Sequence, residues 1–296
     1  AEVADMVIEE GVKILTTGAG SPAAYMEKWK AAGIKVIPVV ASVAYALKMQ
    51  ELGATAVVAE GAEELSGKMP EFLREVLESE AAGKVRAVSP KIAVAKDEAF
   101  CFFYRDNLEL LETLGAKMEY FSPLSDAELP KNTDGLLLYG GYPELHAKEL
   151  SENDTMIREI REKINHGMPV LAECGGYMYL SEAMEDMEGT AYPMVQAVPG
   201  KVYRTKKLGR FGYITLTPNT ENTFQNGGNP VRGHEFHYFD SENCGKAFHA
   251  AKPQRSRGWD CIQAGDSYAA GFPHLYYYSN PGFAANFVEA CRRYDR

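Results

Sequence analysis

The sequence has no hydrophobic run long enough to cross a membrane. In 296 residues, no stretch approaches the ~18 consecutive apolar residues of a transmembrane helix. The first five residues have neither the basic region nor the apolar core of a signal peptide. We therefore expect a cytoplasmic protein with no membrane partner.

Basic residues are also scarce, with 31 Lys and Arg against 41 Asp and Glu. The formal net charge of -10 opposes sequence-independent binding to nucleic acid or to an anionic membrane surface. The composition is otherwise globular, with 46% hydrophobic and 24% charged residues, which excludes a disordered or collagen-like chain. We expect a small-molecule ligand and no nucleic acid partner.

Cysteines are few and widely separated. No two form a C-x-x-C pair and their number, five, is odd, so the spacing supports neither a disulfide framework nor a metal site. At least one is a candidate reactive thiol. They are Cys101, Cys174, Cys244, Cys261 and Cys291.

Two segments of the chain alternate between strand-like and helix-like patterns. The first predicts a βαβαβ unit with a parallel sheet, with strands over residues 12–17, 35–40 and 54–59 and helices over 21–32 and 42–52. A charged helix over 69–82 follows. We expect a first domain over residues 1–65, a helical linker over 66–90 and a second domain over 91–296.

The second segment predicts another α/β sheet, followed by short β-rich pieces. Its predicted strands are 92–95, 117–121, 135–139 and 169–173, and its helices are 104–114 and 156–165. Strands over 213–216, 235–239 and 267–270 precede a last helix over 282–292.

Cys174 stands at the end of a predicted buried strand, between Ala172 and Gly176. This small-x-nucleophile-x-small spacing is typical of a tight strand-to-helix turn that presents a nucleophile. Backbone N–H groups at the start of the helix are expected to lower the pKa of the thiol, and the Gly175 N–H is placed to bind an oxyanion. The pair Gly140-Gly141 ends another buried strand and offers a second N–H.

A nucleophilic thiol needs a base, and the chain has six histidines. Three of them stand among polar residues or at a predicted helix end and are assigned to the surface: His146, His166 and His249. Strand alternation over residues 232–238 places His234 and Phe236 on one face, opposite His237. Spacing alone leaves both His237 and His274 as candidates for the base.

Residues 91–296 resemble the glutamine amidotransferase domain of cobyrinic acid a,c-diamide synthase. The pair Ala172-Glu173 favours this branch over the related cobyric acid synthase, which usually has Gly-Ile there. A nickel-sirohydrochlorin a,c-diamide synthase stays open as an alternative. The resemblance is carried by Asp97 to Leu108, Phe121 to Leu124, Gly140 to Glu144, Ala172 to Gly176 and Arg232 to His237.

The resemblance implies an α/β class I amidotransferase fold, with a flavodoxin-like sheet and flanking helices. It implies that Cys174 attacks the glutamine side-chain carbonyl, and that His274 activates the thiol and protonates the departing ammonia. Because Tyr276 stands where many class I enzymes carry an acid, we expect a Cys–His dyad. The implied oxyanion and glutamine site comprises Gly140, Gly141, Tyr142, Gly175, Arg232, His234 and His237, of which Arg232 and the two histidines either contact the substrate or brace the site.

The resemblance also implies a partner. A complete synthase of this family has an ATP-binding domain, with a P-loop and Mg²⁺, that phosphorylates the corrin carboxylate. In residues 61–69, five residues separate the two glycines and Met69 follows Lys68. A P-loop has four residues between its glycines and Ser or Thr after the Lys, so this stretch does not match one. We expect no cofactor in this chain, and amidation of a corrinoid or related tetrapyrrole only with a synthetase domain in trans.

Residues 7–61 resemble part of a flavin-dependent enoyl-acyl-carrier-protein reductase or nitronate monooxygenase, a TIM barrel that binds FMN. A partial barrel leaves its sheet edges open, so we do not expect FMN binding. Gly18-Ala19-Gly20 mimics a dinucleotide fingerprint, but the acidic residue expected about 20 positions later is absent. The likeness is carried by Val7 to Lys13, Thr16 to Gly20, Ile37 to Val40 and Ala54 to Gly61.

The sequence thus predicts a glutaminase that supplies ammonia for a,c-amidation of cobyrinate, or of a related tetrapyrrole, in cobalamin biosynthesis. Two alternatives stay open. One is a flavin oxidoreductase that acts through residues 7–61, and the other is an inactive amidotransferase remnant that only binds glutamine or a partner.

Overall fold

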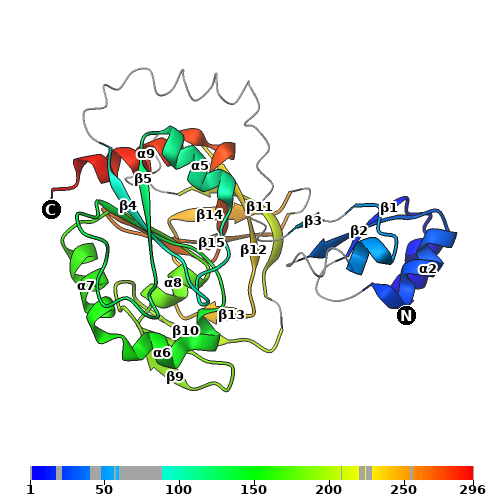
Figure 1. Ribbon diagram of the computed structural model, residues 1–296, viewed down its shortest axis with the longest axis horizontal. Helices are drawn as coiled ribbons and strands as arrows, with labels where there is room; N and C mark the ends of the chain where they lie inside the picture. Colours follow the sequence, from blue (N-terminus) through cyan, green and yellow to red (C-terminus); the bar gives the residue numbers. More distant parts are fainter. Residues whose placement is uncertain are drawn as a thin grey trace. The chain divides into compact units, whose positions relative to one another are not determined.

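The computed structural model describes residues 2–17, 22–40, 48–56, 58–59, 89–207, 209–219, 224, 229–253 and 256–295. The chain divides into two compact units, residues 1–68 and 69–296, whose elements are labelled in Figure 1. Most of the linker predicted over residues 66–90, including its helix over 69–82, lies outside the described residues. The P-loop-like stretch 61–69 and residues 18–20 also lie outside them.

The first unit is a small parallel sheet with two helices. Strands β1 (Ile14–Thr17), β2 (Lys35–Val40) and β3 (Val58–Ala59) pair in that order and run parallel. Helix α2 (Ala23–Ala31) connects β1 to β2, so the predicted βαβ pattern is confirmed. Residues 48–51 are helical, and β3 is shorter than the strand predicted over 54–59.

Helix α1 (Glu2–Glu9) was not predicted. Its Ala4, Val7 and Ile8 pack into the core of the unit, and their i, i+3, i+4 spacing is the apolar stripe of an amphipathic helix. The Trp29 indole N–H of α2 donates to the Ala4 carbonyl at 3.0 Å, which joins the two helices.

The second unit is built on a six-stranded sheet in the order β16-β17-β7-β6-β4-β5. All neighbouring pairs are parallel except the pair of β16 and β17. In parallel strands the carboxyl ends meet at one edge of the sheet, where ligands bind in open α/β folds. The strands are β4 (Lys91–Ala95), β5 (Lys117–Phe121), β6 (Gly135–Leu138), β7 (Val170–Glu173), β16 (Gln263–Ala264) and β17 (Tyr268–Gly271).

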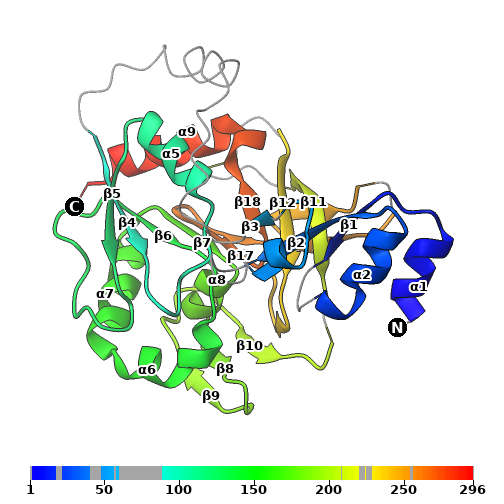
Figure 2. The ribbon, with the colours of Figure 1, turned by 45° about the vertical axis from the view of Figure 1, so that its right-hand side comes forward.

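Helices cover both faces of this sheet (Figure 2). Ile92 and Val94 of β4 share a core with the apolar sides of α5 (Arg105–Thr113) and α9 (Pro281–Arg293). Ala93 and Ala95 point the other way, into a core shared with α7 (Asp154–Asn165) and α8 (Gly175–Leu180). Burial on both faces explains why these strands read as continuous apolar runs. Two short helices, η1 (Pro143–His146) and α6 (Ala147–Glu152), follow β6.

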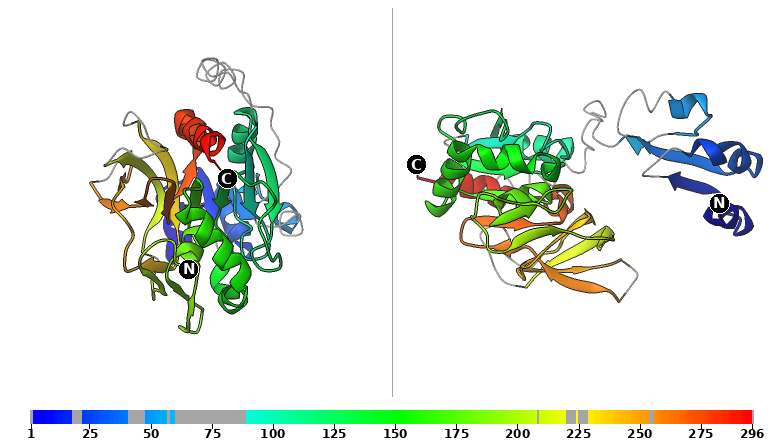
Figure 3. Two further views of the ribbon diagram at one scale, coloured as in Figure 1. Left: turned by 90° about the vertical axis from the view of Figure 1, so that its left-hand side faces the viewer. Right: turned by 90° about the horizontal axis from the view of Figure 1, so that it is seen from below.

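The β-rich part forms two further sheets, and Figure 3 shows its yellow strands to one side of the cyan and green strands of the central sheet. An antiparallel sheet has the order β15-β14-β11-β12-β18, with β11 (Phe211–Pro218), β12 (Val231–Phe236), β14 (Phe248–Ala251), β15 (Gly258–Cys261) and β18 (His274–Tyr276). A smaller sheet has the order β13-β10-β8-β9, with β8 (Ala183–Glu185), β9 (Ala191–Pro193), β10 (Lys201–Arg204) and β13 (Phe239–Ser241). A short helix η2 (Tyr277–Ser279) joins β18 to α9.

The predicted strands and helices of this unit are confirmed to within a few residues, with one exception. The strand predicted over 235–239 is wrong, because β12 ends at Phe236 and β13 begins at Phe239 in a different sheet. His237 Nδ1 is 2.6 Å from the Phe239 carbonyl oxygen, and this local hydrogen bond holds the turn between the two strands.

No helix in the described part of the chain is long and apolar enough to span a membrane.

Gly176 is required by close packing of α8 on β6. A Cβ at this position would lie 2.0 Å from the Leu138 carbonyl oxygen. Because backbone atoms cannot yield as a flexible side chain does, we expect Gly176→Ala to lower the free energy of unfolding by at least about 2 kcal/mol. Gly209→Ala is the matched control, since nothing lies within 4 Å of its Cβ. Thermal denaturation of the two variants tests this, and equal midpoints would contradict it.

Candidate active site

Cys174 lies in the tight turn from β7 to α8 that the sequence predicts. It is the N-cap residue of α8, with φ 48° and ψ -105°, a backbone conformation that is strained for a residue with a Cβ. Two hydrogen bonds hold it there. The Cys174 N–H donates to the Gly271 carbonyl of β17 at 2.8 Å, and the Met178 N–H donates to the Cys174 carbonyl at 3.0 Å.

The loop after β6 lies against the start of α8. A Cβ on Gly175 would be 3.2 Å from the Gly141 nitrogen, so the two backbone amides expected at the oxyanion site are close together. Gly141 itself leaves no room for a side chain, because its Cβ would lie 2.1 Å from the Ala99 carbonyl oxygen. The Tyr142 N–H donates to the same oxygen at 2.9 Å, whereas the Tyr142 side chain is 58% exposed.

His274 is the first residue of β18 and is buried. Its ring stacks on His234, with centroids 4.8 Å apart, and meets the edge of Phe102 at the same centroid separation. Gly140 packs on the ring, since a Cβ there would be 2.5 Å from His274 Cε1. Burial lowers the pKa of His274 well below its usual 6.5, and the neighbouring His234 and His237 lower it further.

The charge state of Cys174 differs from the one expected from the sequence. Burial raises the pKa of its thiol to about 12, and the nearby Glu144 carboxyl raises it further, while the Gly175 N–H only partly opposes this. The expectation that the helix N-terminus lowers this pKa is wrong, because α8 has six residues and desolvation outweighs its dipole. The resting thiol and the His274 imidazole are therefore both neutral at pH 7.

The other predicted site residues fall into two groups. His234 belongs with His274, opposite it in the register of β12 and β18, and its Nδ1 is 2.8 Å from the Tyr104 hydroxyl. Arg232 is exposed on the same strand and pairs in register with Tyr276. The predicted alternation applies only up to Phe236, where β12 ends, so His237 lies in the turn to β13 and outside the strand.

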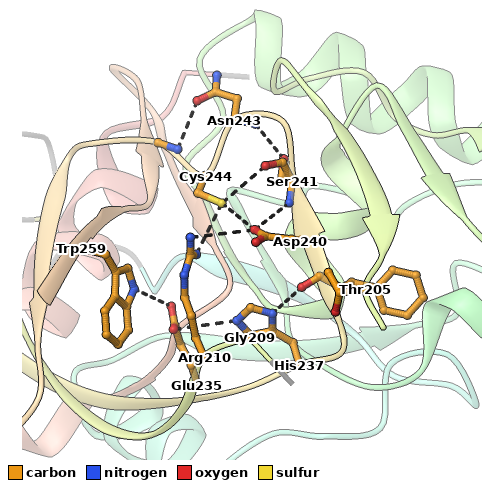
Figure 4. A network of polar contacts seen from close by, with 12 residues as sticks. Thr205, Gly209, Arg210, Glu235, His237, Asp240, Ser241, Asn243, Cys244 and Trp259 are labelled. Carbon is orange, nitrogen blue, oxygen red and sulfur yellow. Dashed lines mark hydrogen bonds and ion pairs between the residues drawn. The ribbon is translucent and has the colours of Figure 1, made fainter. Parts of the chain in front are cut away.

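His237 belongs to a second cluster (Figure 4). Its ring stacks on Phe272 with centroids 4.1 Å apart, and its Nε2 is 3.8 Å from a carboxylate oxygen of Glu235. The Trp259 indole N–H donates to Glu235 Oε1 at 3.4 Å. The contacts of His237 are thus with this buried cluster.

Glu173 is a site residue that the sequence patterns did not identify. It ends β7 directly before Cys174 and is buried, and one of its carboxylate oxygens is 4.0 Å from His274 Nδ1. A signal is present in the sequence, because an acidic residue inside an otherwise apolar strand is costly to bury without a partner. Among the residues that the structure describes, no group of three or more His, Cys, Asp or Glu side chains could hold a metal ion.

Comparison with known proteins identifies the family. Residues 91–275 match the CobB/CobQ-like glutamine amidotransferase domain. The chain belongs to this family. It is 42% identical over 208 residues to the cobyrinate a,c-diamide synthase of Caldanaerobacter subterraneus subsp. tengcongensis, and 42% identical over 205 residues to that of Fusobacterium nucleatum subsp. nucleatum.

These alignments cover 70% and 68% of this chain but only 46% and 44% of the two relatives. The chain therefore spans less than half the length of the curated relatives that it matches. The comparisons confirm that residues 91–296 resemble the amidotransferase domain of cobyrinate a,c-diamide synthases. They also confirm the α/β class I glutamine amidotransferase fold.

Three solved structures are similar to parts of this chain. The structure of PurLQS from Thermotoga maritima covers 70% of this chain and 99% of its own, with 14% identity and a TM-score of 0.47. A crystal structure of a glutamine amidotransferase covers 68% of this chain and 98% of its own, with 15% identity and a TM-score of 0.49. FabK from Thermotoga maritima matches partially, covering 41% of this chain and 37% of its own, with 26% identity and a TM-score of 0.20.

The raised pKa of Cys174 predicts slow reaction with a reagent that does not resemble glutamine. With iodoacetamide at pH 7.5, we expect the exposed Cys101 to be alkylated before Cys174. The rate at Cys174 should rise about tenfold per pH unit from pH 7 to 10, because only the thiolate reacts. Mass spectrometry of the two peptides measures both rates. A Cys174 rate that levels off near pH 8 would contradict the raised pKa.

Proposed function

We propose that this domain hydrolyses glutamine through a thioester on Cys174 and supplies the ammonia for amidation of a tetrapyrrole carboxylate. The observation that supports it most is the position of Cys174, in a strained turn at the carboxyl edge of the sheet, joined by a hydrogen bond to the strand that leads to His274. Glutamine is the substrate implied by a glutamine amidotransferase domain.

The neutral resting pair defines the order of the proton transfers. As the Cys174 sulfur bonds to the glutamine side-chain carbon, its proton passes to His274, whose lowered pKa keeps the imidazole free to accept it. The negative charge on the former carbonyl oxygen is stabilised by the N–H groups of Gly141 and Gly175. His274 then returns the proton to the leaving nitrogen, ammonia departs, and water hydrolyses the thioester to glutamate and free thiol.

The acceptor of the ammonia follows from the relatives. Because they are named cobyrinate a,c-diamide synthases, we propose cobyrinate or a closely related tetrapyrrole as the acceptor and a place in cobalamin biosynthesis. ATP and Mg²⁺ would act in a synthetase domain that works with this one, and the chemistry proposed at Cys174 and His274 needs no cofactor.

Labelling with diazo-oxo-norleucine, a glutamine analogue with an electrophilic carbon, tests the nucleophile and its base. We expect one adduct on the intact wild-type chain, none on Cys174→Ser, and at least about 100-fold slower labelling of His274→Ala. Intact mass spectrometry gives the adduct, and glutamate release measures turnover in the same samples. An adduct on Cys174→Ser would overturn the assignment of the nucleophile. Labelling without glutamate release would favour a domain that binds glutamine but does not hydrolyse it.

Gly140 should be required for activity because it packs on the base. The Cβ of Gly140→Ala would lie 2.5 Å from His274 Cε1, so the ring must move. Since a displacement of about 1 Å can cost about 100-fold in rate, we expect the kcat for glutamate release to fall by about that factor. Gly209→Ala is again the control, with unchanged kcat. Full activity of Gly140→Ala would show that His274 is not the base in this position.

A further inference from the structure

We propose that Glu173 is a positioning residue for His274, in the role that an acid two residues after the histidine has in many class I amidotransferases. An oxygen of its carboxyl group would accept a hydrogen bond from His274 Nδ1–H, which fixes the tautomer that leaves Nε2 free to take the thiol proton. The inference rests on the proposed glutaminase function.

The first support is the geometry of the carboxylate. Glu173 Oε2 is 4.0 Å from His274 Nδ1, with both side chains almost fully buried, at 4% and 6% exposed. This separation is longer than a hydrogen bond, but catalytic hydrogen bonds are often long without substrate and tighten when it binds. A movement of about 1 Å would give a normal N–H···O distance.

The second support is that Glu173 is held at this distance by donors on both sides of it. The Tyr277 hydroxyl donates to Oε1 at 3.0 Å, and the Leu275 N–H donates to Oε2 at 3.3 Å. Both donors come from the segment that carries His274, so they keep the Glu173 side chain beside the imidazole. Glu173 is also paired in register with Gly271 of β17.

The third support is that the position two residues after His274, where many class I amidotransferases have an acid, is a tyrosine here. Tyr276 is two residues after His274 and its side chain is 41% exposed. The acid beside His274 thus comes from β7 and not from β18. It is Glu173, the residue directly before Cys174. Residues 173 and 174 would both act on the same proton transfer.

The groups packed around Glu173 and His274 are apolar or weakly polar. His234 on β12 stacks on His274, and His237 lowers the pKa of His274 without contacting its ring in the described structure. Facing Glu173 are the phenols of Tyr139 and Tyr277. Burial raises the pKa of Glu173 to about 8, so at pH 7 the carboxyl group is mostly protonated and accepts through its carbonyl oxygen. Above its usual pKa it costs folding free energy. A costly buried acid beside a buried histidine is typical of a functional site.

The direct test is the tautomer of His274, measured by NMR of the full chain labelled with ¹⁵N-histidine and assigned with His274→Ala. We expect Nδ1–H in the wild type. In Glu173→Gln we expect a shift toward Nε2–H, because the side-chain amide can donate to Nδ1. A wild type that holds Nε2–H, or a tautomer that is unchanged in Glu173→Gln, would overturn the proposal.

Turnover provides the second readout. We expect Glu173→Gln to lower the kcat for glutamate release by about 100-fold or more, with the KM for glutamine changed less than about threefold. Tyr277→Phe is the matched control, since it removes a donor to the same carboxylate and keeps the acid. It should lower the midpoint of thermal denaturation but change kcat by less than about tenfold. Equal losses of kcat in the two variants would indicate a structural role only and would overturn the proposal.

The two readouts separate this inference from the proposed function. If the wild type releases no more glutamate than Cys174→Ser, the glutaminase function fails, while the tautomer of His274 in the wild type still decides the role of Glu173. If Glu173→Gln does not fold, the tautomer of His274 in the wild type still tests the role of Glu173.

Discussion

The hydrogen bond from the Cys174 N–H to the Gly271 carbonyl is the contact on which the geometry of the site depends. It continues the parallel pairing of β7 and β17 by one residue beyond the end of β7. Cys174 is thereby fixed at the edge of the sheet, and His274 follows three residues after Gly271. Between these two residues the chain leaves the central sheet and enters the antiparallel sheet through β18. The nucleophile and the proposed base thus belong to different sheets that meet at this point.

Close backbone approach around this contact excludes side chains at several positions. A Cβ on Gly233 would lie 2.3 Å from the His274 carbonyl oxygen, so β12 can approach β18 closely only with glycine there. Gly140 allows the imidazole its position in the same way. The result is a buried site, in which desolvation has the largest effect on the pKa values of both Cys174 and His274. Neutral reactants in such a site allow the charge to develop only during the reaction.

Much of this site can be predicted from the sequence, because the decisive signals are local. The small residues around Cys174 indicate the strand-to-helix turn, whereas the strand alternation assumed for residues 232–238 ends at Phe236 with β12. The choice between His237 and His274 cannot be made from spacing, since it depends on how β12 pairs with β18. The direction of the pKa shift at Cys174 cannot be predicted from the sequence either. The sequence indicates the helix N-terminus but not how deeply the thiol is buried. In the sequence Glu173 serves only as a marker of a family branch, since its contact with His274 joins residues about a hundred positions apart.

The fold shows the same division between local and distant information. The buried strands and amphipathic helices of residues 91–296 follow from apolar runs and helical periodicity. The end of β12 at Phe236 does not, because a side-chain hydrogen bond from His237 and a change of sheet decide it.

The backbone conformation of Cys174 has a consequence for how this domain changes over time. Glycine adopts a φ of 48° without the steric penalty that a Cβ brings, so replacement by glycine would relieve strain at the residue on which the chemistry depends. Selection for a more stable chain and selection for a reactive one therefore oppose each other at a single codon. In a lineage that no longer needs the reaction, function would no longer maintain the strain at this residue.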